Sequence, residues 1–313
     1  YEEAGFPKGV VNLVTCSRKE SEILLTDPRI KAVTFVGSTE VGKHIYSVAA
    51  AHGKRVQAQC EAKNHALVLD DCDLESTVNA IVNSTYGCAG MRCMALPAIC
   101  VQETIADEFV KLLKEKARKM VVGCAYHPGT KLGPLVTLEH KRFVCDWIQK
   151  GVDEGAELVL DGRDIVVPGY EGGFFVGPTI FDRVTRDMTV GDREIFGPVT
   201  VIKRVKTFEE GLEIMNASPF ANGSVIFTQN GYYARQFELL SDGGMVGINV
   251  GIPVPSAYFP FSGNKDSFFG DQHVLGLDGV RFYTRAKTVT KHWYDEHSRK
   301  RAVSTWEGTV ERI

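Results

Sequence analysis

Short apolar strands alternate with capped helices along most of the chain, and this alternation constrains the fold more than any other sequence feature. Residues 31–37, Lys-Ala-Val-Thr-Phe-Val-Gly, predict a buried strand that stops at Gly37. Ser38 and Thr39 are good helix caps, and the following segment predicts a helix that ends at Gly53. A strand followed at once by a capped helix is the unit from which parallel sheets are built.

The same rhythm returns later in the sequence. The further elements it predicts are strands at 54–60, 65–73, 223–230 and 244–250, and helices at 74–87 (capped by Asp73), 104–120, 207–218 (opened by a Thr207–Glu210 capping box) and 231–242. This pattern predicts an α/β fold with a mostly parallel sheet. Two segments differ: the glycine-rich stretch 161–177 indicates a loop or edge hairpin, and the alternating stretch 279–293 indicates a late edge strand.

Composition narrows the class of protein. The 313 residues carry a formal net charge of −3 and contain no basic block, which argues against a nucleic-acid partner. No run of 18 apolar residues is present, so no membrane span is expected. The eight cysteines are scattered without a CxxC pair, which favours reduced intracellular thiols over a disulfide framework, and no metal-ligand spacing appears.

Residues 35–42, Phe-Val-Gly-Ser-Thr-Glu-Val-Gly, form the first segment that can carry chemistry. A strand that ends in Gly37-Ser38 before a helix leaves free backbone N–H groups and the positive end of a helix dipole, which suit a phosphate. It is not a GxGxxG fingerprint. Taken alone, an ordinary capped turn explains it better.

Residues 86–95, Tyr-Gly-Cys-Ala-Gly-Met-Arg-Cys-Met-Ala, form the second segment. The small residues before Cys93 would let a ligand approach the backbone, and a cysteine near a helix end beside Arg92 would have a stabilised thiolate. Cys88 fits the apolar period of the preceding helix, so we interpret it as a packing residue. For Cys93 alone, an inert core thiol is the simpler alternative.

A third segment, residues 193–199 (Arg-Glu-Ile-Phe-Gly-Pro-Val), would by itself pass for a surface loop. In this order and spacing, however, the three segments together resemble the NAD(P)-dependent aldehyde dehydrogenase superfamily, and the resemblance runs from Tyr1 to about Trp293. Within it, the segments at 54–71, 90–95, 247–255, 259–271 and 279–290 are most similar to the CoA-acylating methylmalonate- and malonate-semialdehyde dehydrogenases.

The resemblance assigns roles to individual residues. Cys93 would be the nucleophile that attacks the aldehyde and carries the resulting thioester. The remaining assignments all concern the cofactor NAD: Gly37 and Ser38 at the pyrophosphate, Glu194 on the hydroxyls of the nicotinamide ribose, Phe196 beside the nicotinamide, and the backbone around Cys60 near the carboxamide.

Gln59 departs from the superfamily, most of whose members have a glutamate there that activates water against the thioester. An amide cannot accept a proton, whereas a thiol such as coenzyme A forms a useful thiolate fraction at neutral pH without help. The departure therefore favours acyl transfer to coenzyme A. The alternative is a slow hydrolytic dehydrogenase that yields a free acid.

Glu61 and Arg92 raise two further hypotheses. The family usually has glycine at position 61. If the strand ran on by one residue, the Glu61 side chain would share a face with Gln59 and would partly restore a base. The favoured alternative is that the Glu61 side chain points away from this site. Arg92 is suited to bind the carboxylate of a malonate-type semialdehyde through its planar fork. Alternatively, Arg92 forms a salt bridge or lowers the pKa of Cys93.

The resemblance also implies a domain plan. Residues 1–61 would be the remnant of an NAD-binding domain, 62–251 the catalytic domain, 252–293 a return to the cofactor side with an oligomerisation strand, and 294–313 a polar tail. The superfamily's oxyanion asparagine and adenosine-ribose lysine would precede Tyr1, so we expect the C-terminal two-thirds of such an enzyme or an inactive truncated form. A homo-oligomer in the cytoplasm is expected, with the mitochondrial matrix as the alternative.

Overall fold

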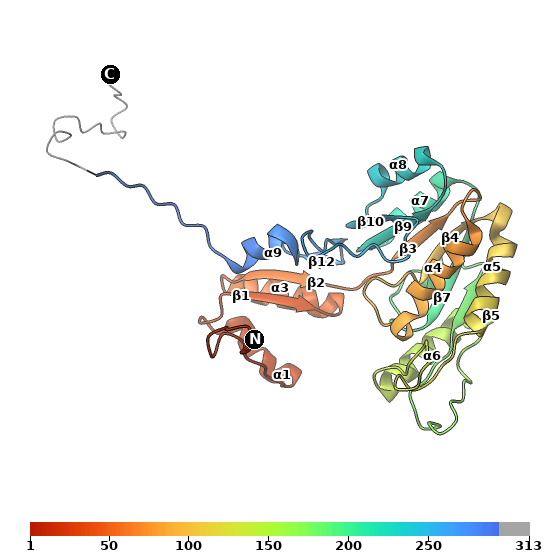
Figure 1. Cartoon of the computed structure of the whole chain (residues 1–313), viewed down its shortest axis with the longest axis horizontal. Coiled ribbons are helices and arrows are strands. Elements are labelled where there is room, and N and C mark those ends of the chain that lie inside the picture. Colours follow the sequence, from red (N-terminus) through yellow and green to blue (C-terminus); the bar gives the residue numbers. More distant parts are fainter. Residues whose placement is uncertain (294–313) are drawn as a thin grey trace, which may run out of the picture.

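A computed structural model describes residues 1–293, which contain a small three-stranded sheet and a large seven-stranded sheet that lie end to end (Figure 1), together with one two-stranded pairing. The polar tail predicted at 294–313 lies outside the described residues. In Figure 1 the small sheet, with β1, β2 and α3, lies at the left, and the large sheet with its helices lies at the right. No helix within residues 1–293 combines the length and the apolar character needed to cross a membrane.

The large sheet has seven strands in the order β10-β9-β3-β4-β7-β6-β5. The bounds are β3 (His65–Val68), β4 (Ala98–Gln102), β5 (Glu157–Leu160), β6 (Thr179–Asp182), β7 (Val199–Val205), β9 (Gly223–Phe227) and β10 (Met245–Ile248). Every neighbouring pair is parallel except β5 and β6. The predicted mostly parallel sheet is therefore confirmed.

Helices cover both faces of this sheet, which is why its central strands are buried along almost their whole length. On β3, Ala66 and Val68 belong to one apolar cluster and Leu67 and Leu69 to another, because alternate side chains point to opposite faces. The first cluster includes α4 (Leu74–Tyr86), α5 (Glu103–Arg118) and α6 (Leu138–Asp153), and the second includes α7 (Phe208–Asn216) and α8 (Gly231–Leu240).

Two of the predicted helix caps are confirmed. The side chain of Asp73 accepts a hydrogen bond from Ser76 N at the start of α4, and Thr207 Oγ1 accepts one from Glu210 N at the start of α7. The long segment between β5 and β6 contains no helix or strand from 163 to 176, as its glycine content predicted. The remaining short elements are α1 (Arg18–Ser21), α2 (Ile23–Thr26), η1 (Gly87–Gly90), η2 (Thr189–Gly191), β8 (Phe220–Ala221) and β11 (Asn264–Lys265).

The small sheet combines strands from two distant parts of the sequence. β1 (Ala32–Val36) and β2 (Arg55–Gln59) are parallel and connected by α3 (Thr39–Ala51), and β12 (Phe268–Phe269) pairs antiparallel with β2. The chain therefore returns to this sheet after crossing the large one. Within residues 1–293, β1 has a strand on one side only, and its last residue, Val36, is 71% exposed.

The late edge strand predicted over 279–293 is not found. Gly279 to Tyr283 instead complete helix α9 (Gly276–Tyr283), and residues 284–293 belong to no strand of the described chain. The helix is fixed by Phe282, which is buried and lies under the Arg55 guanidinium, and by hydrogen bonds from Arg55 Nη1 to the carbonyls of Arg281 and Thr284. An alternating pattern makes a strand only where a sheet edge is available to pair with it.

The two sheets present opposite ends to each other. Gly37 and Ser38 follow β1 and residues 60–61 follow β2, at the carboxyl ends of the small sheet. The segments that carry Cys93 and Phe196 instead precede β4 and β7, at the amino ends of the large sheet. All three chemical motifs of the sequence therefore meet where the sheets adjoin.

Candidate active site

Cys93 lies in an irregular loop before β4, and two asparagine side chains hold its backbone carbonyl. Asn64 Nδ2 and Asn222 Nδ2 each donate to Cys93 O over 2.9 Å. Asn64 also donates to Ala95 O (2.8 Å) and accepts from Gly223 N (2.8 Å). Because Asn64 and Asn222 immediately precede the paired strands β3 and β9, the large sheet itself fixes the loop. The sequence analysis missed both asparagines, although a polar residue before a fully buried strand was a usable signal.

The small residues before Cys93 make a left-handed turn that packs against the third motif. Cys88, Ala89 and Gly90 have φ of 52°, 54° and 73°. A Cβ atom on Gly90 would lie 2.1 Å from Gly197 O, so only glycine fits there. The expectation that these residues admit a ligand to the backbone is wrong for Gly90, since the close approach is made by the protein's own Gly197.

The Arg92 side chain turns away from the Cys93 thiol. Its Nε donates to Cys88 Sγ (3.2 Å) and its Nη1 to Asn83 O (3.4 Å). A Cβ atom on Gly87 would lie 2.6 Å from the guanidinium carbon, so the end of the Arg92 side chain packs directly over this glycine. The prediction that Cys88 is a packing residue is wrong: it is exposed, in a left-handed conformation, and its sulfur accepts this bond.

The Cys93 thiol is not activated in this state. Cys93 is exposed as a residue, yet neighbouring atoms withdraw enough water from the sulfur to raise the pKa of the thiol above its ordinary value. The backbone N–H groups of Cys93 and Met94 lower this pKa and the negative charge of Glu194 raises it, and burial remains the largest contribution. The predicted thiolate stabilisation by Arg92 is therefore not present, because the guanidinium faces Cys88.

Glu194 and Phe196 line the same narrow pocket as Cys93 and Arg92. Glu194 is half-buried, and its Oε1 accepts a hydrogen bond from Ala62 N (3.2 Å). Burial, together with the charge of Glu61, raises the pKa of Glu194 to about 7. Phe196 has φ of 53° and is 39% exposed, and its carbonyl lies 2.7 Å from His140 Nε2. The structure thus brings the second and third motifs into one pocket.

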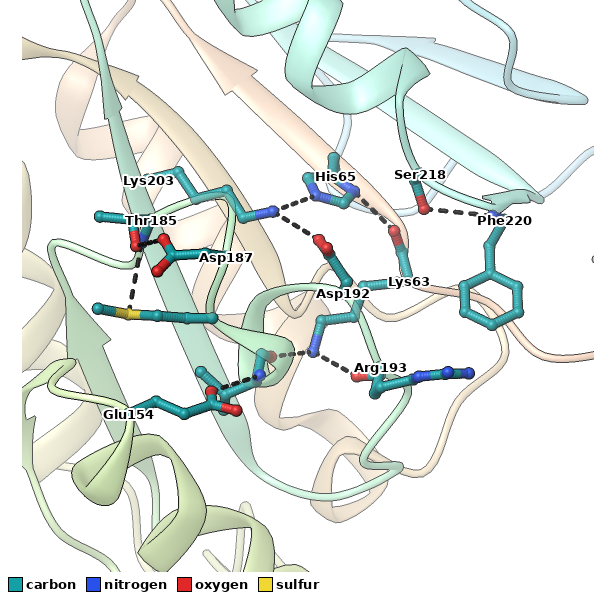
Figure 2. A network of polar contacts seen from close by, with 12 residues as sticks. Lys63, His65, Glu154, Thr185, Asp187, Asp192, Arg193, Lys203, Ser218 and Phe220 are labelled. Carbon is teal, nitrogen blue, oxygen red and sulfur yellow. Dashed lines mark hydrogen bonds and ion pairs between the residues drawn. The ribbon is translucent and has the colours of Figure 1, made fainter.

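A buried lysine anchors the segment that carries Glu194 (Figure 2). Lys63 Nζ donates to Val190 O (3.0 Å) and Arg193 O (2.8 Å) at the end of η2. The side chain is 2% exposed, and burial lowers the pKa of Lys63 to about 7. On the other side of the segment, Glu154 accepts a hydrogen bond from Val190 N (3.0 Å). Three hydrogen bonds to backbone groups, two from Lys63 and one to Glu154, therefore hold the segment before Glu194 in place.

A second buried lysine extends this support (Figure 2). Lys203 Nζ lies 3.0 Å from Asp192 Oδ1 and 3.4 Å from His65 Nε2, and His65 Nδ1 lies 2.7 Å from Lys63 O. Burial and the nearby Lys203 charge hold the pKa of His65 well below its usual value, so the ring is neutral. Lys63, His65 and Lys203 were missed in the sequence because nothing marks a charged residue as buried. Among residues 1–293, no group of three potential ligands is placed to bind a metal ion.

Gln59 is connected to Cys93 through Asn222. Gln59 Nε2 donates to Asn222 Oδ1 over 3.1 Å, and Gln59 Oε1 is buried without a hydrogen-bond partner in the structure. The Asn222 amide cannot turn over, because its nitrogen must face the Cys93 carbonyl. Its oxygen therefore faces residue 59, where a donor is required. A glutamine meets this requirement and a carboxylate does not.

Of the residues assigned to the cofactor, Ser38 lines a cleft of about 810 Å³ between the two sheets, and Glu61 lines it as well. Ser38 occupies the cap position of α3 and is exposed, but its side chain makes no capping bond. Glu61 Oε2 instead accepts a hydrogen bond from Thr39 N over 3.0 Å. β2 ends at Gln59, so the strand does not run on, and this geometry does not support Glu61 as a replacement base for Cys93.

Gly37 and Cys60 complete this side. Gly37 N donates to Gln59 O (3.1 Å), which ties the end of β1 to the end of β2. Cys60 N donates to Ser267 O (2.8 Å), and its side chain packs under α3, where a Cβ atom on Gly42 would lie 2.2 Å from the sulfur. Burial raises the pKa of the Cys60 thiol to about 11, so this side chain is buried packing and not a nucleophile.

Comparisons with known proteins agree with this arrangement. A family model described as "Aldehyde dehydrogenase family" matches residues 1–289. The chain is 48% identical over 294 residues to malonate-semialdehyde dehydrogenase 1 of Oceanobacillus iheyensis, a match that covers 94% of this chain and 60% of the relative.

Solved structures are equally similar. A crystal structure of methylmalonate-semialdehyde dehydrogenase from Oceanimonas doudoroffii superposes with a TM-score of 0.92 at 43% identity and covers 95% of this chain and 61% of that one. A Sinorhizobium meliloti protein named as a methylmalonate-semialdehyde dehydrogenase and complexed with NAD gives a TM-score of 0.92 at 40% identity, over 94% of this chain and 60% of that chain. The chain thus spans about 60% of the length of these relatives.

The environment of Cys93 predicts a pH dependence. Because burial raises the pKa of the thiol, alkylation by iodoacetamide should keep accelerating above the pH at which an ordinary thiol has ionised. Arg92→Leu should leave this profile in place, since the guanidinium contacts Cys88 and Asn83. Rates are measured by peptide mass spectrometry from pH 6 to 11, with the exposed Cys16 as internal reference. A profile that shifts to higher pH in the variant would contradict the structure.

The Gln59–Asn222 contact predicts an energetic coupling. Gln59→Glu should destabilise the protein by about 1–3 kcal/mol, because two buried oxygens would then face each other. In an Asn222→Ala background the same substitution should cost clearly less. Urea unfolding of the four proteins of this cycle measures both costs. Equal costs in the two backgrounds would show that Asn222 does not select the residue at position 59.

Proposed function

The chain belongs to the aldehyde dehydrogenase family, and from this premise we propose that the protein oxidises malonate or methylmalonate semialdehyde with NAD and transfers the product acyl group to coenzyme A. The observation that carries the proposal is the pocket in which Cys93 lies with Arg92, Glu194 and Phe196, held by an asparagine that selects an amide at position 59. The names of the relatives support the substrate class.

Cys93 supplies the nucleophile. Its thiolate attacks the aldehyde carbon, and loss of hydride from the resulting thiohemiacetal leaves a thioester on Cys93. Because burial raises the pKa of the thiol, formation of the thiolate costs free energy in the free protein. The two asparagines that hold the Cys93 carbonyl fix the sulfur during this attack.

NAD, when bound, supplies the hydride acceptor. The residues available to hold it are Ser38 at the start of α3, the Glu194 carboxylate and the exposed face of Phe196, which all lie along the junction of the two sheets. The exposed Ser38 hydroxyl, which makes no capping bond, fits a phosphate ligand. The carboxylate of Glu61 at the same helix end does not.

The amide at position 59 supports coenzyme A as the acyl acceptor. After hydride loss, the bond to the β-carboxylate breaks, CO₂ leaves, and its electron pair enters the thioester as an enolate that takes up a proton. The thiolate of coenzyme A then attacks the thioester carbonyl and Cys93 thiolate departs, which gives acetyl-CoA or propionyl-CoA. Gln59 cannot activate water for the competing hydrolysis.

Arg92 is proposed to bind the substrate carboxylate. It lines the Cys93 pocket and also a neighbouring cleft of about 400 Å³ that contains Lys116, Lys119 and Lys131. Its hydrogen-bond partners are a sulfur and a backbone carbonyl, so a substrate carboxylate would provide a stronger one.

The bacterial relatives support a cytoplasmic location. We further propose a homo-oligomer in which residues 284–293 pair with another chain.

The acyl acceptor is tested by product analysis. The protein expressed from its complete reading frame is incubated with NAD and malonate semialdehyde, with and without coenzyme A. We expect NADH formation, acetyl-CoA with coenzyme A, and little turnover beyond one equivalent without it. Multiple turnovers to free acid without coenzyme A would establish the hydrolytic alternative. No NADH under either condition would establish an inactive form.

Substrate selectivity tests Arg92. Arg92→Leu should reduce kcat/KM for malonate semialdehyde at least about 50-fold, a loss of roughly 2–3 kcal/mol for a charge-assisted contact, and should change kcat/KM for propanal by only a few-fold. Arg118→Leu, which alters a cation at the exposed end of α5, is the control. Equal losses on both aldehydes would assign Arg92 a structural role.

A further inference from the structure

The most unusual feature outside the Cys93 pocket is the position of the Glu61 carboxylate at the start of helix α3. It accepts a hydrogen bond from Thr39 N (3.0 Å), the first N–H group of a helix whose Ser38 side chain makes no capping bond. A helix start carries about half a unit of positive charge and unsatisfied N–H groups, so an anion is held there by both. Glu61 is that anion in the free protein.

The contacts around Glu61 hold it in this position. Ser267 Oγ donates to Glu61 O over 2.7 Å, which fixes the backbone from which the side chain extends. Thr39 Oγ1 donates to Asp266 O (3.0 Å), and Lys43 pairs with Asp266 (3.0 Å), so the turn at 264–267 also fixes the first turn of α3. The carboxylate and the helix start are thus positioned together by one neighbouring segment.

The helix start that Glu61 occupies is also where the proposed function places the cofactor. Gly37 and Ser38 connect β1 to α3, and Ser38, Thr39 and Glu61 line the same cleft between the sheets. A phosphate oxygen and a carboxylate oxygen cannot accept from Thr39 N at once. The charge of Glu61 also extends to the nicotinamide side, since it raises the pKa of Glu194.

We propose that Glu61 is an intramolecular competitor of the cofactor phosphates, which it excludes from the start of helix α3 until its side chain swings away. This inference rests on the proposed function for the identity of the ligand. It makes position 61 a determinant of cofactor affinity, and it predicts that the protein binds NAD more weakly than a version without this carboxylate.

The test is calorimetric titration with NAD of the protein expressed from its complete reading frame. Glu61→Gly, which removes charge and acceptor, should lower the Kd for NAD at least about ten-fold, the equivalent of about 1.4 kcal/mol. Glu61→Gln, which keeps an acceptor but loses the charge, should lower it by a smaller factor. Glu40→Gln removes an exposed carboxylate from the first turn of the same helix and should leave the Kd within about two-fold.

Inorganic pyrophosphate serves as a second probe that carries phosphates without nicotinamide. Tighter binding of pyrophosphate to Glu61→Gly supports the competition even if none of the proteins binds NAD, a result that would overturn the proposed function alone. An unchanged or higher Kd for both probes in both Glu61 variants would overturn the inference. Equal effects of the Glu40 and Glu61 substitutions would also overturn it, because they would indicate general repulsion rather than a competed contact.

A thermal measurement separates competition from simple loss of stability. Without ligand, Glu61→Gly should melt below the parent protein, because Thr39 N loses its acceptor. With saturating NAD, the gap should narrow or reverse, because the phosphates then supply the acceptor in both proteins. A gap that stays unchanged at NAD concentrations that saturate both proteins by calorimetry would overturn the inference.

Discussion

The site depends on the two asparagine amides that hold the carbonyl of Cys93. A backbone carbonyl can only accept, so both amide nitrogens must face it and both amide oxygens must face elsewhere. The oxygen of Asn64 accepts from Gly223 N, and the oxygen of Asn222 accepts from Gln59. One carbonyl thereby sets the direction of hydrogen bonds across three strands. The loop that carries Cys93 therefore constrains Gln59, which stands where most of the family has its water-activating glutamate.

The same region explains the buried lysines. The segment before β7 carries Glu194 into the junction between the sheets, and it is too irregular to satisfy its own carbonyls. Lys63 supplies donors to two of them, and Lys203 reaches Asp192 beside them. Burying an ammonium group is costly, and the lowered pKa of Lys63, about 7, records that cost. Without these lysine contacts the segment would not hold Glu194 at a fixed position.

The fold could be predicted from the sequence, whereas the orientation of the site could not. Periodicity and capping residues located α3, α4 and α7 because those signals are local. Cys88 was misplaced because a left-handed turn breaks the helical period that seemed to continue through it. Arg92 was aimed at Cys93 by sequence adjacency, but its direction depends on the space above Gly87. The stretch 279–283 became a helix because Phe282 packs under Arg55, a contact between distant residues.

Glu61 shows how one contact can favour the fold and oppose the ligand. A carboxylate at a helix start stabilises the free protein, and it does so through the N–H group and dipole that would attract a phosphate. The glycine usual at this position in the family leaves that helix start open. A glutamate fills it and also adds negative charge beside Glu194. The free protein keeps the contact between Glu61 and Thr39 N, and an anion that binds at the same helix start must break it. Any stability that this contact adds to the free protein is therefore subtracted from the binding free energy of the anion.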